Sequence, residues 1–246
     1  MVHGWMPGAQ RLSGVDSGGV PRGGAPRVIW GTTESDPRAI PALSAARHLV
    51  QRSRPSHLVW NPRDGEMVQL LPATAAVPER LVCPNQLDRG QDGRLCIVVE
   101  VVGFAALPFT DGPVRGLGAI VSWLDTLGIA HTWPGGCPLR CGQAPGQRTS
   151  EALWAGGGHF GLSQFPGSTT ASPGAISPQL ILEAPEQTRA ALPPERERKR
   201  FPWPGYGALS PSRTHPGPTT WHDGEHDREV REVRGGNGVA TTPAGV

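Results

Sequence analysis

Apolar and polar positions alternate along residues 27–184 in short segments that turn signals separate, a pattern typical of a globular α/β domain. Residues 28–30 (Val-Ile-Trp) predict a short buried strand. Residues 95–102 are nearly all apolar and rich in β-branched side chains, which predicts the central strand of a sheet. Residues 57–61 and 66–71 flank the sequence Pro-Arg-Asp-Gly, whose Asp-Gly step predicts a hairpin turn between two strands.

Three further segments predict helices. Leucine, isoleucine and valine between residues 117 and 127 fall on one helical face, and Gly128 suits the position that follows a helix. A looser helical spacing at residues 40, 43, 46 and 50 follows the Ser-Asp-Pro step at residues 35–37, which favours a helix start there. Residues 150–155 predict a short helix.

The two ends of the chain depart from this pattern. Residues 1–26 are rich in glycine and predict an irregular lead-in rather than a regular element. Of the 62 residues from 185 to 246, seven are Leu, Ile, Val or Phe, whereas 17 are charged and 17 are Gly or Pro. This composition predicts a disordered tail after a domain at residues 27–184.

Charge and hydropathy narrow the classes of partner. The chain has 23 Lys and Arg against 21 Asp and Glu, so it lacks the basic excess of a dedicated nucleic-acid binder. No window of about 18 uncharged apolar residues is present, so we expect no membrane span. The N-terminus does not have the pattern of a secretory signal. These two expectations leave the localisation open between the cytoplasm and release by lysis. We expect the protein to be a monomer.

The four cysteines do not form a recognisable metal or disulfide framework. Cys137 and Cys141 are spaced C-x3-C in a loop rich in Pro and Gly, whereas Cys83 and Cys96 stand alone. Because the paired C-x2-C spacing of structural zinc sites is missing, we expect separate thiols. Two other motifs lack their context: the G-x-G-x-x-G at residues 156–161 follows a predicted helix rather than a strand, and Ser163 lacks the final glycine of a nucleophile elbow.

Four segments, taken in order, are similar to one known family. Residues 27–35 (RVIWGTTES) form an opening strand, and residues 56–72 (SHLVWNPRDGEMVQLLP) form a hairpin with a D-G turn. Residues 96–105 (CIVVEVVGFA) form a central strand with an inward glutamate, and residues 157–176 (GGHFGLSQFPGSTTASPGAI) form a closing segment. Together they resemble the zinc-dependent N-acetylmuramoyl-L-alanine amidases of the peptidoglycan-recognition type, and most closely the actinobacterial and actinophage cell-wall lytic enzymes.

The resemblance implies a fold and a chemistry. The fold is α/β, with a mixed central β-sheet, flanking helices and a zinc site in a surface cleft. Three protein ligands would hold the metal and leave one position open, so that zinc polarises an amide of peptidoglycan and activates a water. A carboxylate near the metal, at Glu100 here, would position that water or transfer its proton. The implied partner is peptidoglycan or a muropeptide.

The residues differ from the family at the positions that bind the metal. The first histidine position falls on Gly31, the second on Leu162, and the aspartate of the closing segment falls on Ser172. A basic residue near the last ligand is replaced by Thr170. Because glycine and leucine cannot bind zinc, the resemblance predicts an amidase-like protein without bound zinc and with impaired or no catalysis.

Two histidines remain as candidates for the cleft. His57 belongs to the hairpin, and His159 lies three residues before Leu162, an odd offset that places the two side chains on opposite faces of a strand. An active zinc amidase that uses His57, His159 or a cysteine stays an alternative, as does a decayed or artificial sequence without function. In the tail, residues 201–220 resemble the opening of a wall-binding repeat.

Overall fold

The structure is a computed structural model that describes residues 4–78, 81–82, 88–139 and 149–191, with side chains to residue 184. The predicted tail lies outside the described residues from 192 onward, and so does the resemblance of residues 201–220 to a wall-binding repeat. Cys83 and Cys141 also lie outside them. None of the described helices is long and apolar enough to cross a membrane.

The described part contains one mixed sheet of six strands in the order β1-β4-β3-β5-β2-β6. The strands are β1 (Gln10–Arg11), β2 (Arg27–Thr32), β3 (Leu58–Trp60), β4 (Met67–Gln69), β5 (Cys96–Val101) and β6 (Gly158–Gly161). Only the β3–β4 pair is antiparallel among these strands; the other neighbours run parallel. The predicted α/β class with a mixed sheet is therefore confirmed.

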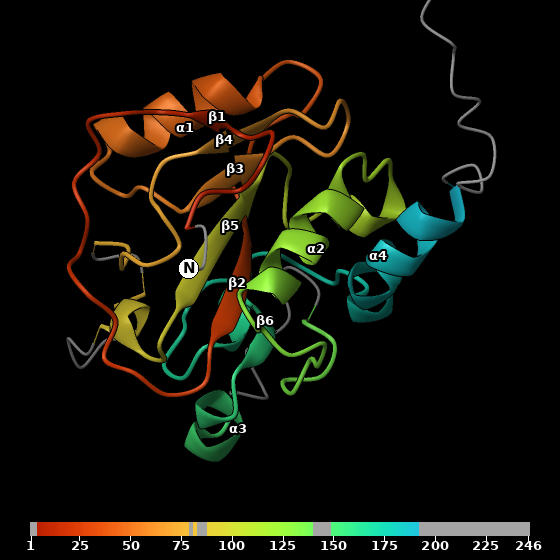
Figure 1. Ribbon diagram of the computed structural model, residues 1–246. Helices are drawn as coiled ribbons and strands as arrows, with labels where there is room; N and C mark the ends of the chain where they lie inside the picture. The colour runs from red at the N-terminus through yellow and green to blue at the C-terminus, as the bar shows by residue number, and fades with distance from the viewer. Residues whose placement is uncertain (1–3, 79–80, 83–87, 140–148, 192–246) are drawn as a thin grey trace, which may run out of the picture. The chain divides into compact units, whose positions relative to one another are not determined.

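Helices cover both faces of the sheet (Figure 1). They are α1 (Ala42–Gln51), α2 (Leu117–Thr126), α3 (Glu151–Ala155) and α4 (Pro178–Ala191), with short 3-10 turns at Arg89–Gln91, Phe109–Asp111 and Leu162–Gln164. One apolar cluster joins a face of the sheet to α2 and α4. A second cluster joins the opposite face to α1 and to Trp154 of α3. The parallel strands β2 and β5 lie between these layers and are wholly buried.

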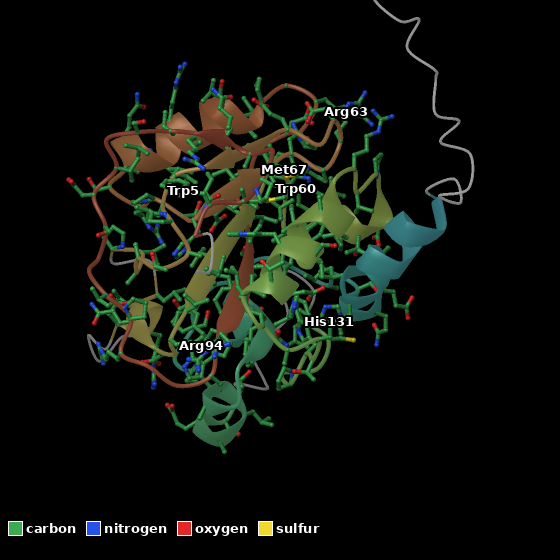
Figure 2. All side chains as sticks on the ribbon, in the orientation of Figure 1. Trp5, Trp60, Arg63, Met67, Arg94 and His131 are labelled. Atoms are coloured by element: carbon green, nitrogen blue, oxygen red, sulfur yellow. The ribbon has the colours of Figure 1, made fainter. Side chains whose placement is uncertain are left out.

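Most predicted elements are present. The strand at residues 95–102 is β5, which lies inside the sheet between β3 and β2. The Asp-Gly step lies in the β3–β4 connection, where Gly65 has φ +85°, and Trp60 and Met67 pair across the hairpin (Figure 2). Gly128 follows α2 with φ +75°. These agreements arise where local pattern and tertiary packing favour the same conformation.

Three predictions need correction. The first predicted helix begins only at Ala42, because Pro37–Ile40 form a turn on the Asp36 carbonyl and Pro41 precedes the first helical residue. The lead-in is not wholly irregular, since β1 pairs with β4 and Met6 is buried. The buried side-chain amide of Gln69 fixes the start of the lead-in. Its Oε1 accepts from the Met6 N–H at 2.6 Å, and its Nε2 donates to the Gly4 carbonyl at 3.0 Å. In addition, α4 continues to Ala191, beyond the predicted domain boundary at residue 184.

The outer edge of β6 is covered. The His159 N–H donates to the Thr132 carbonyl at 2.8 Å, and the Gly161 N–H donates to Oε1 of Gln164 at 2.9 Å. The same Gln164 oxygen accepts from the indole N–H of Trp133 at 2.8 Å. The segment around residues 132–133 therefore lies along this edge of the sheet and is fixed there through Gln164.

Candidate functional site

The residues at the expected metal-binding positions lie together at the carboxyl ends of β2 and β6. Gly31 is the register partner of Glu100 on β5. Trp30, the residue before Gly31, pairs with Gly161, the residue before Leu162, so the parallel register places Gly31 beside Leu162. Ser172 reaches the same end of β2, because its Oγ accepts from the Thr32 N–H at 2.8 Å.

Glu100 lies directly over Gly31. A Cβ placed on Gly31 would be 2.8 Å from Oε1 of Glu100 and 3.1 Å from its Cδ, closer than side-chain carbons approach in real proteins. Glu100 is 0% exposed. The missing side chain at position 31 thus makes the space that the Glu100 carboxyl group occupies.

Ser172 belongs to a short chain of hydroxyl groups. The Thr32 hydroxyl lies 2.9 Å from Oγ of Ser172 and donates to Oε1 of Glu34 at 2.6 Å. The same Glu34 oxygen accepts from the Ala105 N–H at 3.0 Å. Thr170, the candidate for the lost basic residue, is half-buried, and its Oγ1 accepts from the Ser172 N–H at 3.2 Å. These contacts fix the closing segment to the end of β2. The Ser172 oxygen is already hydrogen-bonded to protein groups.

Leu162 has a packing role. Its side chain is buried in the α1-side cluster with Ile29, Phe160 and Phe165. Its carbonyl accepts from the Ser168 hydroxyl at 2.7 Å. A hydrocarbon side chain therefore fills the position that the resemblance gives to a histidine.

His57 is held by the backbone on both sides of its ring. Nδ1 accepts from the Val98 N–H at 3.0 Å, and Nε2 lies 2.9 Å from the Ala75 carbonyl, which fixes the proton on Nε2. The side chain is fully buried, and burial lowers its pKa to about 4. The expectation that His57 faces a cleft is therefore wrong, because both ring nitrogens are used to join the start of β3 to β5 and to the Ala75 carbonyl.

His159 points to the face opposite Leu162, as its odd offset predicts. Its Nδ1 accepts from the indole N–H of Trp30 at 3.2 Å, and the two rings are stacked. Burial, followed by the nearby His131, lowers the pKa of His159 to about 3. His159 is fully buried, so the structure places it in the α2-side core and not with Gly31 and Glu100.

The residues present at the carboxyl ends of β2 and β6 do not fit zinc. Gly31 offers no ligand atom, Leu162 offers hydrocarbon, and the Ser172 hydroxyl is held between the Thr32 amide and hydroxyl groups. Cys96 is buried, and burial raises the pKa of its thiol to about 12, which disfavours the thiolate that metals require. Within the described ranges, no group of three or more His, Cys, Asp and Glu residues could hold a metal ion.

A pocket of about 1090 Å³ opens near the carboxyl end of β5. Val102 and Gly103, which follow β5, line it together with Ala175 of the closing segment. One wall is apolar and includes Phe104 and Leu107, of which Leu107 is 70% exposed. The hydroxyl chain reaches this wall through the bond between Glu34 and Ala105.

The sequence did not reveal the charged residues of the pocket. Arg38 and Arg63 line it from two separate turns, and Asp36 and Asp111 also contribute. The available signal was the Asn-Pro-Arg-Asp-Gly sequence at residues 61–65, which we interpreted only as a hairpin turn. Asn61, the first residue of this sequence, also donates hydrogen bonds to the carbonyls of Pro37 and Ile40.

No family model matches the chain, and no curated protein matches it. Among solved structures, it is similar to the Ph2119 endolysin from Thermus scotoductus MAT2119 bacteriophage Ph2119, with 15% identity and a TM-score of 0.40 over 71% of this chain and 92% of that chain. It is similar to the endolysine N-acetylmuramoyl-L-alanine amidase LysCS from Clostridium intestinale URNW, with 13% identity and a TM-score of 0.44 over 75% and 98%. It is also similar to the Staphylococcus aureus hydrolase AmiA, with 12% identity and a TM-score of 0.45 over 74% and 84%.

Proposed function

We propose that this chain is an amidase-like, peptidoglycan-directed protein that binds wall fragments without zinc-dependent hydrolysis. The proposal starts from the four ordered sequence segments that resemble the amidase family. The observation that carries it is the arrangement at the end of β2, where Gly31, Leu162 and Ser172 lie together beside Glu100. Position 31 meets positions 162 and 172 of the distant closing segment where the resemblance expects a metal site, and none of the three supplies a zinc ligand.

The chemistry that remains is insufficient for amide hydrolysis of the family type. A metal supplies several kcal/mol of charge stabilisation in the transition state and lowers the pKa of the attacking water. Glu100 could accept a proton, but it would face an unactivated water and an unpolarised carbonyl. Thr170, a neutral residue, would not replace the charge of a cation near a developing oxyanion.

Binding, in contrast, requires only the pocket. The pocket near the carboxyl end of β5 is large enough for a peptide fragment and combines an apolar wall with charged residues. The alternative of an active amidase with unusual ligands has no observation in its favour, since His57 and His159 lie in separate environments and are bonded within the core.

The test combines wall binding with product release. Purified full-length protein is mixed with purified bacterial cell wall, and we expect it to sediment with the wall while the number of free amino termini stays constant. A zinc-dependent amidase run in parallel shows that the wall preparation is cleavable. Metal analysis of the same protein preparation should find zinc well below one ion per chain.

The possible outcomes separate the three hypotheses. Release of peptide stems with bound zinc would show an active amidase and overturn the proposal. Absence of sedimentation by a protein with a cooperative thermal transition would overturn peptidoglycan binding. Absence of a cooperative transition would instead support a decayed or artificial sequence.

A further inference from the structure

Two turns that each carry an exposed arginine are joined by one buried side chain. Asn61 is 1% exposed, and its Nδ2 donates to the carbonyls of Pro37 at 2.9 Å and Ile40 at 3.2 Å, which flank Arg38. Its Oδ1 accepts from the Arg63 N–H at 3.0 Å. The amide group of Asn61 therefore fixes the backbones of Arg38 and Arg63 relative to each other.

Each turn is also held internally. Oδ1 of Asp36 accepts from the Arg38 N–H at 2.9 Å, and the Asp36 carbonyl accepts from the Ile40 N–H at 2.9 Å. On the other side, the Asn61 carbonyl accepts from the Gly65 N–H at 2.9 Å. Both arginines thus project from rigid backbone, which reduces the conformational entropy lost when their side chains bind a ligand.

The guanidinium groups of Arg38 and Arg63 make no hydrogen bond or ion pair with any described residue, although both line the pocket. Arg89 behaves differently, since it pairs with Asp92 and Glu151. Two carboxylates share the pocket: Asp36, which is bonded to the Arg38 amide, and Asp111. Figure 2 shows Arg63 at the periphery of the molecule, where a ligand can reach it.

We propose that Arg38 and Arg63 form a pair that binds carboxylate groups and selects peptides with free carboxylates over the same peptides as amides. The inference rests on the proposed function, because peptidoglycan stem peptides carry free or amidated carboxyl groups. Guanidinium groups bind carboxylates through paired, charge-assisted hydrogen bonds, which a neutral amide cannot reproduce. The apolar residues that also line the pocket, Phe104 and Leu107 among them, suit the methyl groups of alanine residues in such peptides.

The test uses the full chain and two synthetic probes, the peptide L-Ala-γ-D-Glu-L-Lys-D-Ala and the same peptide with both carboxyl groups amidated. Isothermal calorimetry should show that the parent protein prefers the acid by about 10-fold or more, as expected for hydrogen bonds to charged groups. The double variant Arg38→Gln, Arg63→Gln should bind both peptides equally. Asp111→Asn, the matched change of opposite sign, should keep or increase the preference.

Asn61 is a positioning residue in this proposal. Asn61→Ala should reduce the ratio of the affinity for the acid to the affinity for the amide, a result that simple destabilisation would not produce. Measurements are made well below the melting temperature of each variant. If Asn61→Ala does not fold, the exposed arginine variants still decide the question.

The outcomes distinguish this inference from the proposed function. Equal binding of acid and amide by the parent protein would overturn the carboxylate pair and leave peptidoglycan binding intact. A preference that survives in the double arginine variant would also overturn it. Binding of neither peptide, together with failure to sediment with cell wall, would overturn the proposed function and this inference with it.

Discussion

Glu100 folds its carboxyl group over Gly31, so that a Cβ at position 31 would lie only 2.8 Å from Oε1. The two residues are register partners on β2 and β5, which are both fully buried along their length. Each therefore sets a condition for the other: a side chain at position 31 requires Glu100 to move, and Glu100 can keep its place only beside glycine.

The first prediction tests this dependence. Gly31→Ala should lower the free energy of unfolding by about 1–3 kcal/mol, because the new methyl group forces the Glu100 carboxyl out of its place. In a Glu100→Ala background the same substitution should cost less, so the double-mutant cycle should show a coupling above about 0.5 kcal/mol. Urea unfolding of the parent protein, the two single variants and the double variant measures this coupling.

Gly103→Ala is the matched control for this cycle. No atom lies within 4 Å of a Cβ built at Gly103, and its φ is not in the left-handed region. We expect it to change stability by less than about 0.5 kcal/mol. Equal costs at positions 31 and 103 would contradict the steric relationship.

The second prediction concerns the convergence of the three positions. The combined variant Gly31→His, Leu162→His, Ser172→Asp should bind one zinc ion with an open fourth position, and zinc should raise its melting temperature. Because the histidine at position 31 meets Glu100, we expect the metal-free variant to be less stable than the parent protein.

Metal analysis and melting curves with and without zinc provide the measurement. The parent protein and the variant that changes only Leu162 to histidine are the controls, and both should contain no stoichiometric zinc. A folded triple variant that binds none would show that the three positions do not form one site.

The third prediction addresses the hydroxyl chain. Ser172→Ala removes the acceptor of the Thr32 N–H, a buried backbone group, and should cost about 1–3 kcal/mol in the free energy of unfolding. Ser163→Ala is the control, because the buried Ser163 hydroxyl has no hydrogen-bond partner among the described residues. We expect the control to be neutral or slightly stabilising, and thermal unfolding compares the two.

The fourth prediction follows from the buried His57. Its pKa is about 4 in the folded protein, below the ordinary value of 6.5, so the unfolded chain binds a proton that the folded state excludes. The free energy of unfolding should therefore decrease as the pH falls from 6.5 to 4. Below pH 4, His57 should cause no further decrease. The loss attributable to His57 is about 3 kcal/mol.

His57→Asn should lower the number of protons taken up on unfolding by up to one, which makes stability depend less on pH. At pH 7 it should lower the free energy of unfolding by about 1–3 kcal/mol, because the Ala75 carbonyl loses its donor. Urea unfolding at pH 7, 5 and 4 provides the comparison. His48→Asn removes a histidine from an exposed helix position and is the matched control for the substitution itself. An unchanged profile in the His57 variant would contradict a buried neutral histidine.

The strands β2 and β5 and the helix α2 could be predicted from the sequence because their patterns are local. A run of β-branched residues, or apolar residues on one helical face ended by Gly128, specifies an element without knowledge of its partners. The inward position of Glu100 was an expectation from the resemblance of this strand to the central strand of the amidase family.

The contacts of His57, Gln69 and Asn61 could not be predicted in this way. Each of these buried polar side chains bonds to backbone groups far away in the sequence: Nδ1 of His57 to Val98, Gln69 to Met6, and Asn61 to Pro37. Backbone amides and carbonyls are present at every position, so the residue types give no sign of which partner is used. The strand β1 was missed for the same reason, because two residues carry no periodic pattern and only the pairing with β4 defines them.

The covered margin of β6 affects how the protein behaves at high concentration. An open sheet edge presents free N–H and C=O groups that invite strand addition by a second molecule. At β6 the outward N–H groups of His159 and Gly161 already have acceptors, Thr132 and Gln164. A second chain would have to displace the segment around Thr132 and Trp133 before it could extend the sheet there, so this edge resists edge-to-edge aggregation.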